Sequence, residues 1–149
     1  MKHIKEYKLF ESYPPNKFEI ESERKYKELE PDVKDILLEL NDSGIISHTS
    51  KYIDDIIFEF QIEITSLKTP EQKQICEDSL LRLEYFLSDH GLHLARIEMD
   101  QLIPSWYNFS TSEGRNPESH EFELYDMSEL GNLKESAGII SLLVYFSKG

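Results

Sequence analysis

The most constraining feature of the sequence is the alternating run from Asp55 to Ile64, DIIFEFQIEI. Large apolar side chains occupy every even position from Ile56 onward, whereas carboxylates and an amide occupy most odd positions. Because successive side chains of a β-strand point to opposite faces, the pattern predicts one buried face and one solvated face. Such a strand is typical of an antiparallel sheet covered on one side, since strands buried on both faces are apolar throughout.

A first helix is predicted to begin near Pro31, a residue suited to the first helical position, and to end at Gly44. Residues 17–30 alternate in charge without a clear apolar stripe, and we interpret them as an arm or a weak helix. The chain is therefore expected to comprise an N-terminal segment, 1–30, and one domain, 31–149. The buried stripe of the helix is predicted to contain Val33, Ile36, Leu37 and Leu40.

A second helix carries stronger boundary signals. Thr69 is the predicted N-cap, Pro70 takes the first helical position, and Gln72 completes a capping box. Gly91, directly after His90, is expected to end the helix. Its apolar face is broad and comprises Ile75, Cys76, Leu80, Leu83, Tyr85, Phe86 and Leu87.

Further extended segments are predicted at 45–49, which leads through Ser50-Lys51 into the alternating strand, at 92–102 and at 120–127. In the second of these, Ala95, Ile97 and Met99 share one face. Residues 138–146 are apolar at both odd and even positions, which indicates a strand in mid-sheet or one whose second face contacts something else. The predicted fold is α+β, a two-layer sandwich in the order αββαβββ, with two main helices on one face of a four- or five-stranded antiparallel sheet.

Charge excludes several classes of partner. Asp and Glu number 29 against 16 Lys and Arg, for a formal net charge of -13. Such a field disfavours direct binding to nucleic acid or to anionic membranes, and it supports either solubility or attraction to a basic partner. Cys76 is the sole cysteine, and neither a signal-peptide pattern nor a membrane-spanning run appears in the sequence. A cytoplasmic location is expected.

Two stretches, MKHIKEYKLFES at 1–12 and VKDILLELNDSGI at 33–45, resemble small proteins encoded by large tailed bacteriophages, marine ones in particular. The resemblance covers about the first third of the chain and transfers no functional residue. It implies a context, either a component of the virion or a small protein directed at host machinery, in the host cytoplasm.

Catalytic, metal-binding and cofactor-binding residues are not predicted. His90 and His93, beside Asp89, lack the helical i, i+4 spacing of a zinc-binding face and are expected to be structural. Cys76 falls on the apolar helix face and is expected in the core. Standard motifs for a serine nucleophile or a phosphate-binding loop are absent from the sequence. An enzyme that uses paired carboxylates and a metal ion stays as an alternative.

The candidate interface has two parts. Trp106, Tyr107 and Phe109 cluster in a turn-rich segment, 104–118, which is expected to be a surface loop that either covers the core or binds a partner. Carboxylates on the solvated strand face form the second part, at Asp55, Glu59 and Glu63. We expect a non-catalytic binding or assembly protein that acts through protein contacts, with a second copy of the chain as a further candidate partner. The alternative of another class is an acidic inhibitor of host defence that mimics DNA or sequesters a nucleotide signal.

Overall fold

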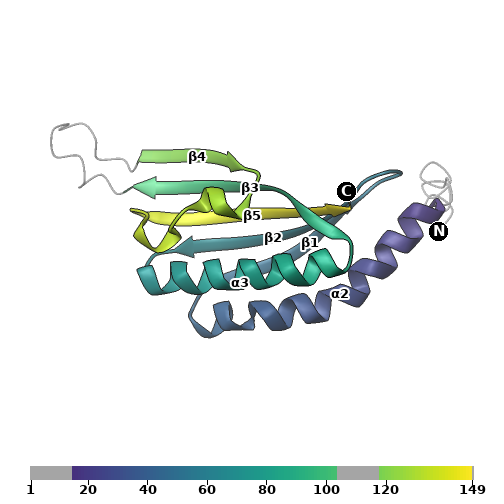
Figure 1. The fold of residues 1–149 in the computed structure, drawn as a ribbon, viewed down its shortest axis with the longest axis horizontal. Helices are drawn as coiled ribbons and strands as arrows, with labels where there is room; N and C mark the ends of the chain where they lie inside the picture. The colour runs from purple at the N-terminus through teal and green to yellow at the C-terminus, as the bar shows by residue number, and fades with distance from the viewer. Residues whose placement is uncertain (1–14, 104–117, 149) are drawn as a thin grey trace, which may run out of the picture.

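The computed structural model describes residues 15–103 and 118–148 and shows two layers, with two helices on one face of a five-stranded sheet (Figure 1). The predicted α+β class and element order are confirmed. The elements are α2 (Lys17–Asp42), β1 (Ile46–Ile53), β2 (Phe58–Leu67), α3 (Pro70–Asp89), β3 (Leu92–Ile103), β4 (Glu118–Leu124), the 3-10 helices η2 (Met127–Leu130) and η3 (Leu133–Glu135), and β5 (Ile139–Lys148).

The sheet has the order β1-β2-β5-β3-β4, and all its pairs are antiparallel. The last strand of the chain thus lies in the middle, between two pairs of strands that are adjacent in sequence. This position confirms the mid-sheet interpretation of the apolar C-terminal run. It also explains why β5 is apolar at both odd and even positions. The even-numbered side chains are buried in the core under the helices, and Tyr145 is buried on the opposite face of the sheet. Those core positions are Ile140, Leu142, Val144 and Phe146.

The first helix begins earlier than predicted. A capping box at Asn16 and Glu19 starts α2 at Lys17, so the expected start near Pro31 is wrong and residues 17–30 are helical. Burial of Tyr26 and Leu29 contributes about 3–6 kcal/mol, which offsets the penalty of about 3 kcal/mol for a proline inside a helix. Figure 1 shows a bend in α2, as expected of a helix that continues through a proline. The buried stripe runs along the whole helix: Ser22, Tyr26, Leu29, Val33, Leu37 and Leu40.

The second helix matches its predicted boundaries. Thr69 and Gln72 form the capping box, Pro70 occupies the first turn, and Gly91 after the helix has a φ of +79° that favours glycine. Cys76 is fully buried, as predicted. Tyr85, assigned to the apolar face, is instead 78% exposed. Leu83 and Leu87 are buried on successive turns of α3, whereas Tyr85, midway between them in sequence, lies outside the buried stripe. The apolar face of the helix is therefore narrower than predicted.

The alternating strand begins later than predicted. β2 starts at Phe58, and a turn at Asp54–Ile57 separates it from β1. The Asp54 carboxylate accepts hydrogen bonds from the backbone N–H groups of Ile56 at 2.9 Å and Ile57 at 2.7 Å, which closes the turn. Ser50 and Lys51, expected at the bend, are therefore inside β1, and Ile56 is 80% exposed rather than buried. The predicted burial of even positions holds within the strand itself, for Phe58, Phe60, Ile62 and Ile64.

Two irregularities change which positions face the helices. Ser66, at a φ of +59°, lies in a break of the register between β2 and β5, and the odd-numbered Leu67 is buried after it. A second register shift in β3 lies between Leu94 and Arg96. At the other end of the sheet, β4 stops at Leu124, three residues before the predicted end. The alternation of apolar and polar residues in the sequence could not locate the two register shifts or the end of β4.

Phe58 and Ile56 provide a matched test of the sheet assignment. Phe58→Ala should lower the free energy of unfolding by about 3–5 kcal/mol, because the ring is 2% exposed in the core. Ile56→Ala should change it by less than about 0.5 kcal/mol, because this side chain projects from the turn. Urea unfolding of both variants measures the difference. Similar losses in the two variants would contradict the observed start of β2.

Candidate protein-binding surface

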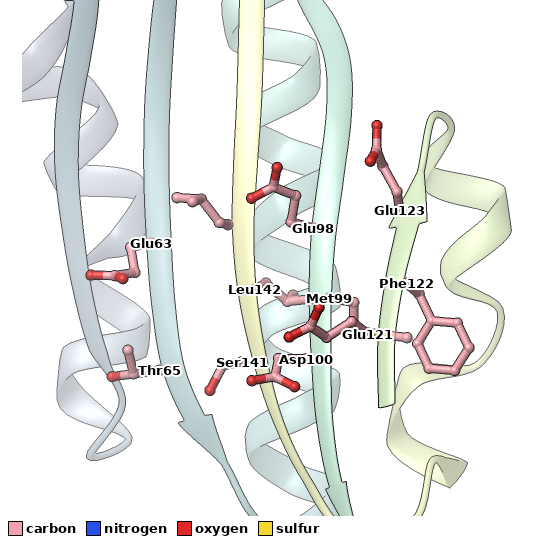
Figure 2. A pocket seen from close by; sticks show the side chains of 11 residues that line it. Glu63, Thr65, Glu98, Met99, Asp100, Glu121, Phe122, Glu123, Ser141 and Leu142 are labelled. Atoms are coloured by element: carbon pink, nitrogen blue, oxygen red, sulfur yellow. The ribbon is translucent and has the colours of Figure 1, made fainter. Parts of the chain in front are cut away.

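The candidate site is the face of the sheet that lies opposite the helices, which we call the outer face. Figure 2 views it from outside, with the helices behind the strands. Strand register brings β2, β5, β3 and β4 together on this face, because Glu63 and Glu98 both pair with Leu143, and Glu98 also pairs with Glu123. On these four strands the outer face includes Glu59, Gln61, Glu63, Thr65, Arg96, Glu98, Asp100, Glu121, Glu123, Ser141, Leu143 and Tyr145. Six of these residues are carboxylates and one is a cation.

A shallow groove of about 630 Å³ runs across the middle of the outer face. Its sides carry carboxylates from three strands, and the half-buried Leu143 of β5 lies between them. Figure 2 shows the carboxylate side chains of Glu63, Glu98, Asp100, Glu121 and Glu123 projecting from the sheet. An open groove with an apolar centre and a charged margin resembles the core and rim of a protein interface.

Carboxylates of β3 and β4 lie directly opposite one another. Glu98 pairs with Glu123, and Asp100 pairs with Glu121. Like charges directly opposite each other in a sheet destabilise it. Two hydroxyl groups offset part of this repulsion. The Tyr125 hydroxyl donates to Glu123 at 2.6 Å, and the Ser119 hydroxyl donates to Asp100 at 3.0 Å. Arg96 already lies 3.5 Å from Glu98, so a cationic partner would relieve repulsion mainly at the pair Asp100–Glu121.

Arg96 organises one end of the outer face. Its guanidinium lies 3.7 Å from the centre of the Tyr145 ring and donates to Glu59 at 3.1 Å and to Glu98 at 3.5 Å. The Tyr145 hydroxyl donates to Glu98 at 3.0 Å. Burial and the bond to the Glu98 carboxylate raise the pKa of the Tyr145 phenol above its ordinary value. The four side chains bond to one another, so this end of the face is preorganised, and one of the groove carboxylates, Glu98, belongs to this cluster.

The predicted interface residues are found in different places. Glu59 and Glu63 lie on the outer face, with Glu59 paired to Arg96 and Glu63 in the groove. Asp55 lies in the turn between β1 and β2, where its carbonyl accepts a hydrogen bond from the Asn16 side chain, so it does not share the strand face as expected. The three aromatic residues predicted for the interface, Trp106, Tyr107 and Phe109, are outside the described residues.

Sequence reasoning did not bring Glu98, Asp100, Glu121 and Glu123 into the same site as Glu63. The alternation in each strand was readable, with Glu98 and Asp100 on the face opposite Ile97. What the sequence lacked was the strand order, which inserts β5 between β2 and β3 and so places the acidic residues of three strands around one apolar strand. The contact of Arg96 with Tyr145 depends on that order too.

The other residues with chemical potential have structural surroundings. Burial raises the pKa of the Cys76 thiol to about 12, so the thiolate nucleophile is suppressed. His90 ends α3, with its Nδ1 atom 2.9 Å from the Phe86 carbonyl, while His93 lies on β3. Within residues 15–103 and 118–148, no three His, Cys, Asp or Glu side chains gather in a way that could hold a metal ion. In the same ranges, neither helix is apolar over the length needed to cross a membrane.

The pair Arg96–Glu59 can be tested by a double-mutant cycle. Arg96→Gln and Glu59→Gln should show a coupling of about 1 kcal/mol in urea unfolding, because both side chains are mostly buried and the cation also stacks on Tyr145. The matched control is Arg82–Glu39, a 2.8 Å pair between the helices with side chains 50% and 58% exposed. Its coupling should stay below about 0.5 kcal/mol. Equal couplings would contradict the preorganised role of Arg96.

Comparison with known proteins adds no relative. The chain matches no family model, no curated protein and no solved structure.

Proposed function

We propose that the chain is a non-catalytic binding protein whose outer face docks a basic protein surface. The observation that carries this proposal is a sheet face that none of the described helices covers and that places six carboxylates on the strands on either side of β5. A sheet with one face packed and one solvated is stable by itself, so the charge pattern on the solvated side is free to serve recognition. The resemblance of the N-terminal third to phage proteins suggests the context, a virion component or a protein directed at the host.

A protein partner fits the outer face better than a nucleic acid or an anionic membrane. Phosphate groups would meet the carboxylates of three strands and be repelled. A basic protein surface can contact the carboxylates and also cover Leu143 and the face of Tyr145. Charged contacts of this kind set the association rate and the specificity, while buried aromatic and apolar side chains supply most of the affinity.

The second candidate is a mimic of nucleic acid, and the regular spacing of the carboxylates favours it. Glu98 and Asp100 on β3, with Glu123 and Glu121 opposite them on β4, form a two-by-two array. Side chains two residues apart on a strand are separated by roughly 7 Å, and adjacent strands by roughly 5 Å. A mimic would bind the groove of a DNA-binding protein through charge alone. Leu143→Ser would then leave binding unchanged, whereas it should weaken the docking of a partner that covers Leu143.

A carboxylate-based enzyme has less support. The groove carboxylates stand in pairs on an open face, and the described residues bring no third ligand to either pair. An open face also leaves water at the carboxylates, so their ability to stabilise a transition state is weak.

The proposal predicts salt-sensitive binding of a basic probe. A peptide of alternating Arg and Leu should bind the protein in calorimetry, and a peptide of alternating Glu and Leu should not. The triple variant Glu63→Gln/Asp100→Asn/Glu121→Gln should weaken binding about tenfold, or about 1.4 kcal/mol. Binding should also weaken as salt rises, since the Debye length is about 8 Å at physiological ionic strength.

A matched control separates the outer face from net charge. Glu28→Gln/Asp32→Asn/Asp35→Asn removes the same number of charges from exposed positions on α2. This variant should bind the Arg-Leu peptide within about twofold of the unaltered protein. Equal weakening in both triple variants would show that the peptide responds to net charge, and the proposal for the outer face would fail.

A further inference from the structure

The two edges of the sheet differ in a way that points to a second copy of the chain. β1 and β4 are the edge strands, and among the described residues each has one partner strand. The backbone groups along the far side of an edge strand are a template for pairing with another chain. Natural proteins usually protect such an edge with a proline, a bulge, a projecting lysine or other charges.

β1 lacks these protections. It is eight residues long, has no proline, and pairs with β2 in an unbroken register from Ile46 to Ile53. Its lysine, Lys51, is held on the helix side, where it pairs with Glu23 and lies 5.0 Å from the Tyr26 ring centre. The cation is therefore directed toward α2, and within residues 15–103 and 118–148 no strand pairs with the far side of β1.

Charge distinguishes the two edges. β1, with the sequence ISHTSKYI, contains no carboxylate, whereas β4 contains Glu118, Glu121 and Glu123. Pairing β4 with β4 of a second copy would bring like charges together in a chain that already carries a net charge of -13. Pairing β1 with β1 avoids that cost.

We propose that two copies of the chain pair through β1 in antiparallel fashion and form a twofold dimer. A register centred on Thr49 places Ile46 of one copy opposite Tyr52 of the other, twice by symmetry. These are the exposed large apolar side chains of β1, at 60% and 49% exposure. The register thus buries both in aromatic–aliphatic cross-strand pairs, a stabilising combination in sheets. The two five-stranded sheets become one, and their outer faces become continuous.

This dimer does not depend on the binding of a basic partner. A twofold pairing also closes on itself, because each β1 edge is used once. Pairing of β1 with β4 of the next copy would instead leave one open edge at each end and produce filaments.

Disulfide trapping tests both the edge and the register. The double variant Ile46→Cys/Tyr52→Cys should form a covalent dimer under mild oxidation, since opposite residues of an antiparallel pair are about 4.5–5.5 Å apart between Cα atoms, within disulfide range. Within one chain the two positions are separated by roughly 20 Å, so they cannot bond to each other. Non-reducing electrophoresis measures the product. Cys76 is buried and serves as the unreactive background.

Single variants are the controls. Ile46→Cys alone and Tyr52→Cys alone should stay largely uncrosslinked, because each cysteine then faces the original residue of the other copy. Crosslinking of the singles as efficient as that of the double would overturn the register. Failure of the double variant to crosslink would overturn the dimer.

Light scattering provides a second measurement. The unaltered chain should have twice its 17.5 kDa mass at micromolar concentration. Tyr52→Glu should shift it to a monomer, and Glu121→Gln on β4 should leave it a dimer. A monomer at every concentration, or open-ended assemblies larger than a dimer, would contradict the β1 pairing.

Discussion

The structure depends on β5 filling the middle of the sheet. The pairs β1–β2 and β3–β4 are each local in sequence, and among the described strands β5 alone joins them. Contacts of such long sequence separation are entropically costly to form, so β5 must bring a large apolar surface to complete the fold. Its four core side chains and the absence of any carboxylate fit this requirement.

The approach to β5 is fixed by contacts from two elements. The Lys73 side chain, 3% exposed on α3, donates to the carbonyls of Ser136 at 2.6 Å and Gly138 at 2.7 Å. Gly138 has a φ of +78°, and a Cβ atom there would lie 2.3 Å from the Leu102 carbonyl oxygen of β3. Burial lowers the pKa of the Lys73 ammonium, a cost that the carbonyls offset. These contacts hold the start of β5 against β3, and they leave no room for a residue larger than glycine at position 138.

Fold and site differ in how far the sequence predicts them. The apolar alternation of β2 and the capping box of α3 were readable because they are local patterns, and the structure confirms both. The start of α2 was missed, although its capping box at Asn16 and Glu19 is as local as that of α3. What the sequence did not show is that Tyr26 and Leu29 pack into the core, which stabilises the helix through Pro31. The outer face was readable strand by strand only. Its assembly requires the strand order, which is a property of the whole chain.

The two faces of the sheet therefore have separate roles. The inner face, under α2 and α3, contains the core. The outer face holds carboxylates of three strands, with like-charged pairs at Glu98–Glu123, where Arg96 offsets part of the repulsion, and at Asp100–Glu121. A surface that costs stability when it is free and gains it when it is bound is suited to recognition. We propose that the outer face is where the protein contacts its partner.

The most direct test is residue-resolved NMR of the full chain during titration with the Arg-Leu peptide. We expect the amide signals of Glu63, Glu98, Asp100 and Leu143 to shift together and saturate, while the amide signals of exposed acidic residues on α2 and α3 stay unchanged. Shifts concentrated on the helices, or spread evenly over all acidic residues, would contradict it.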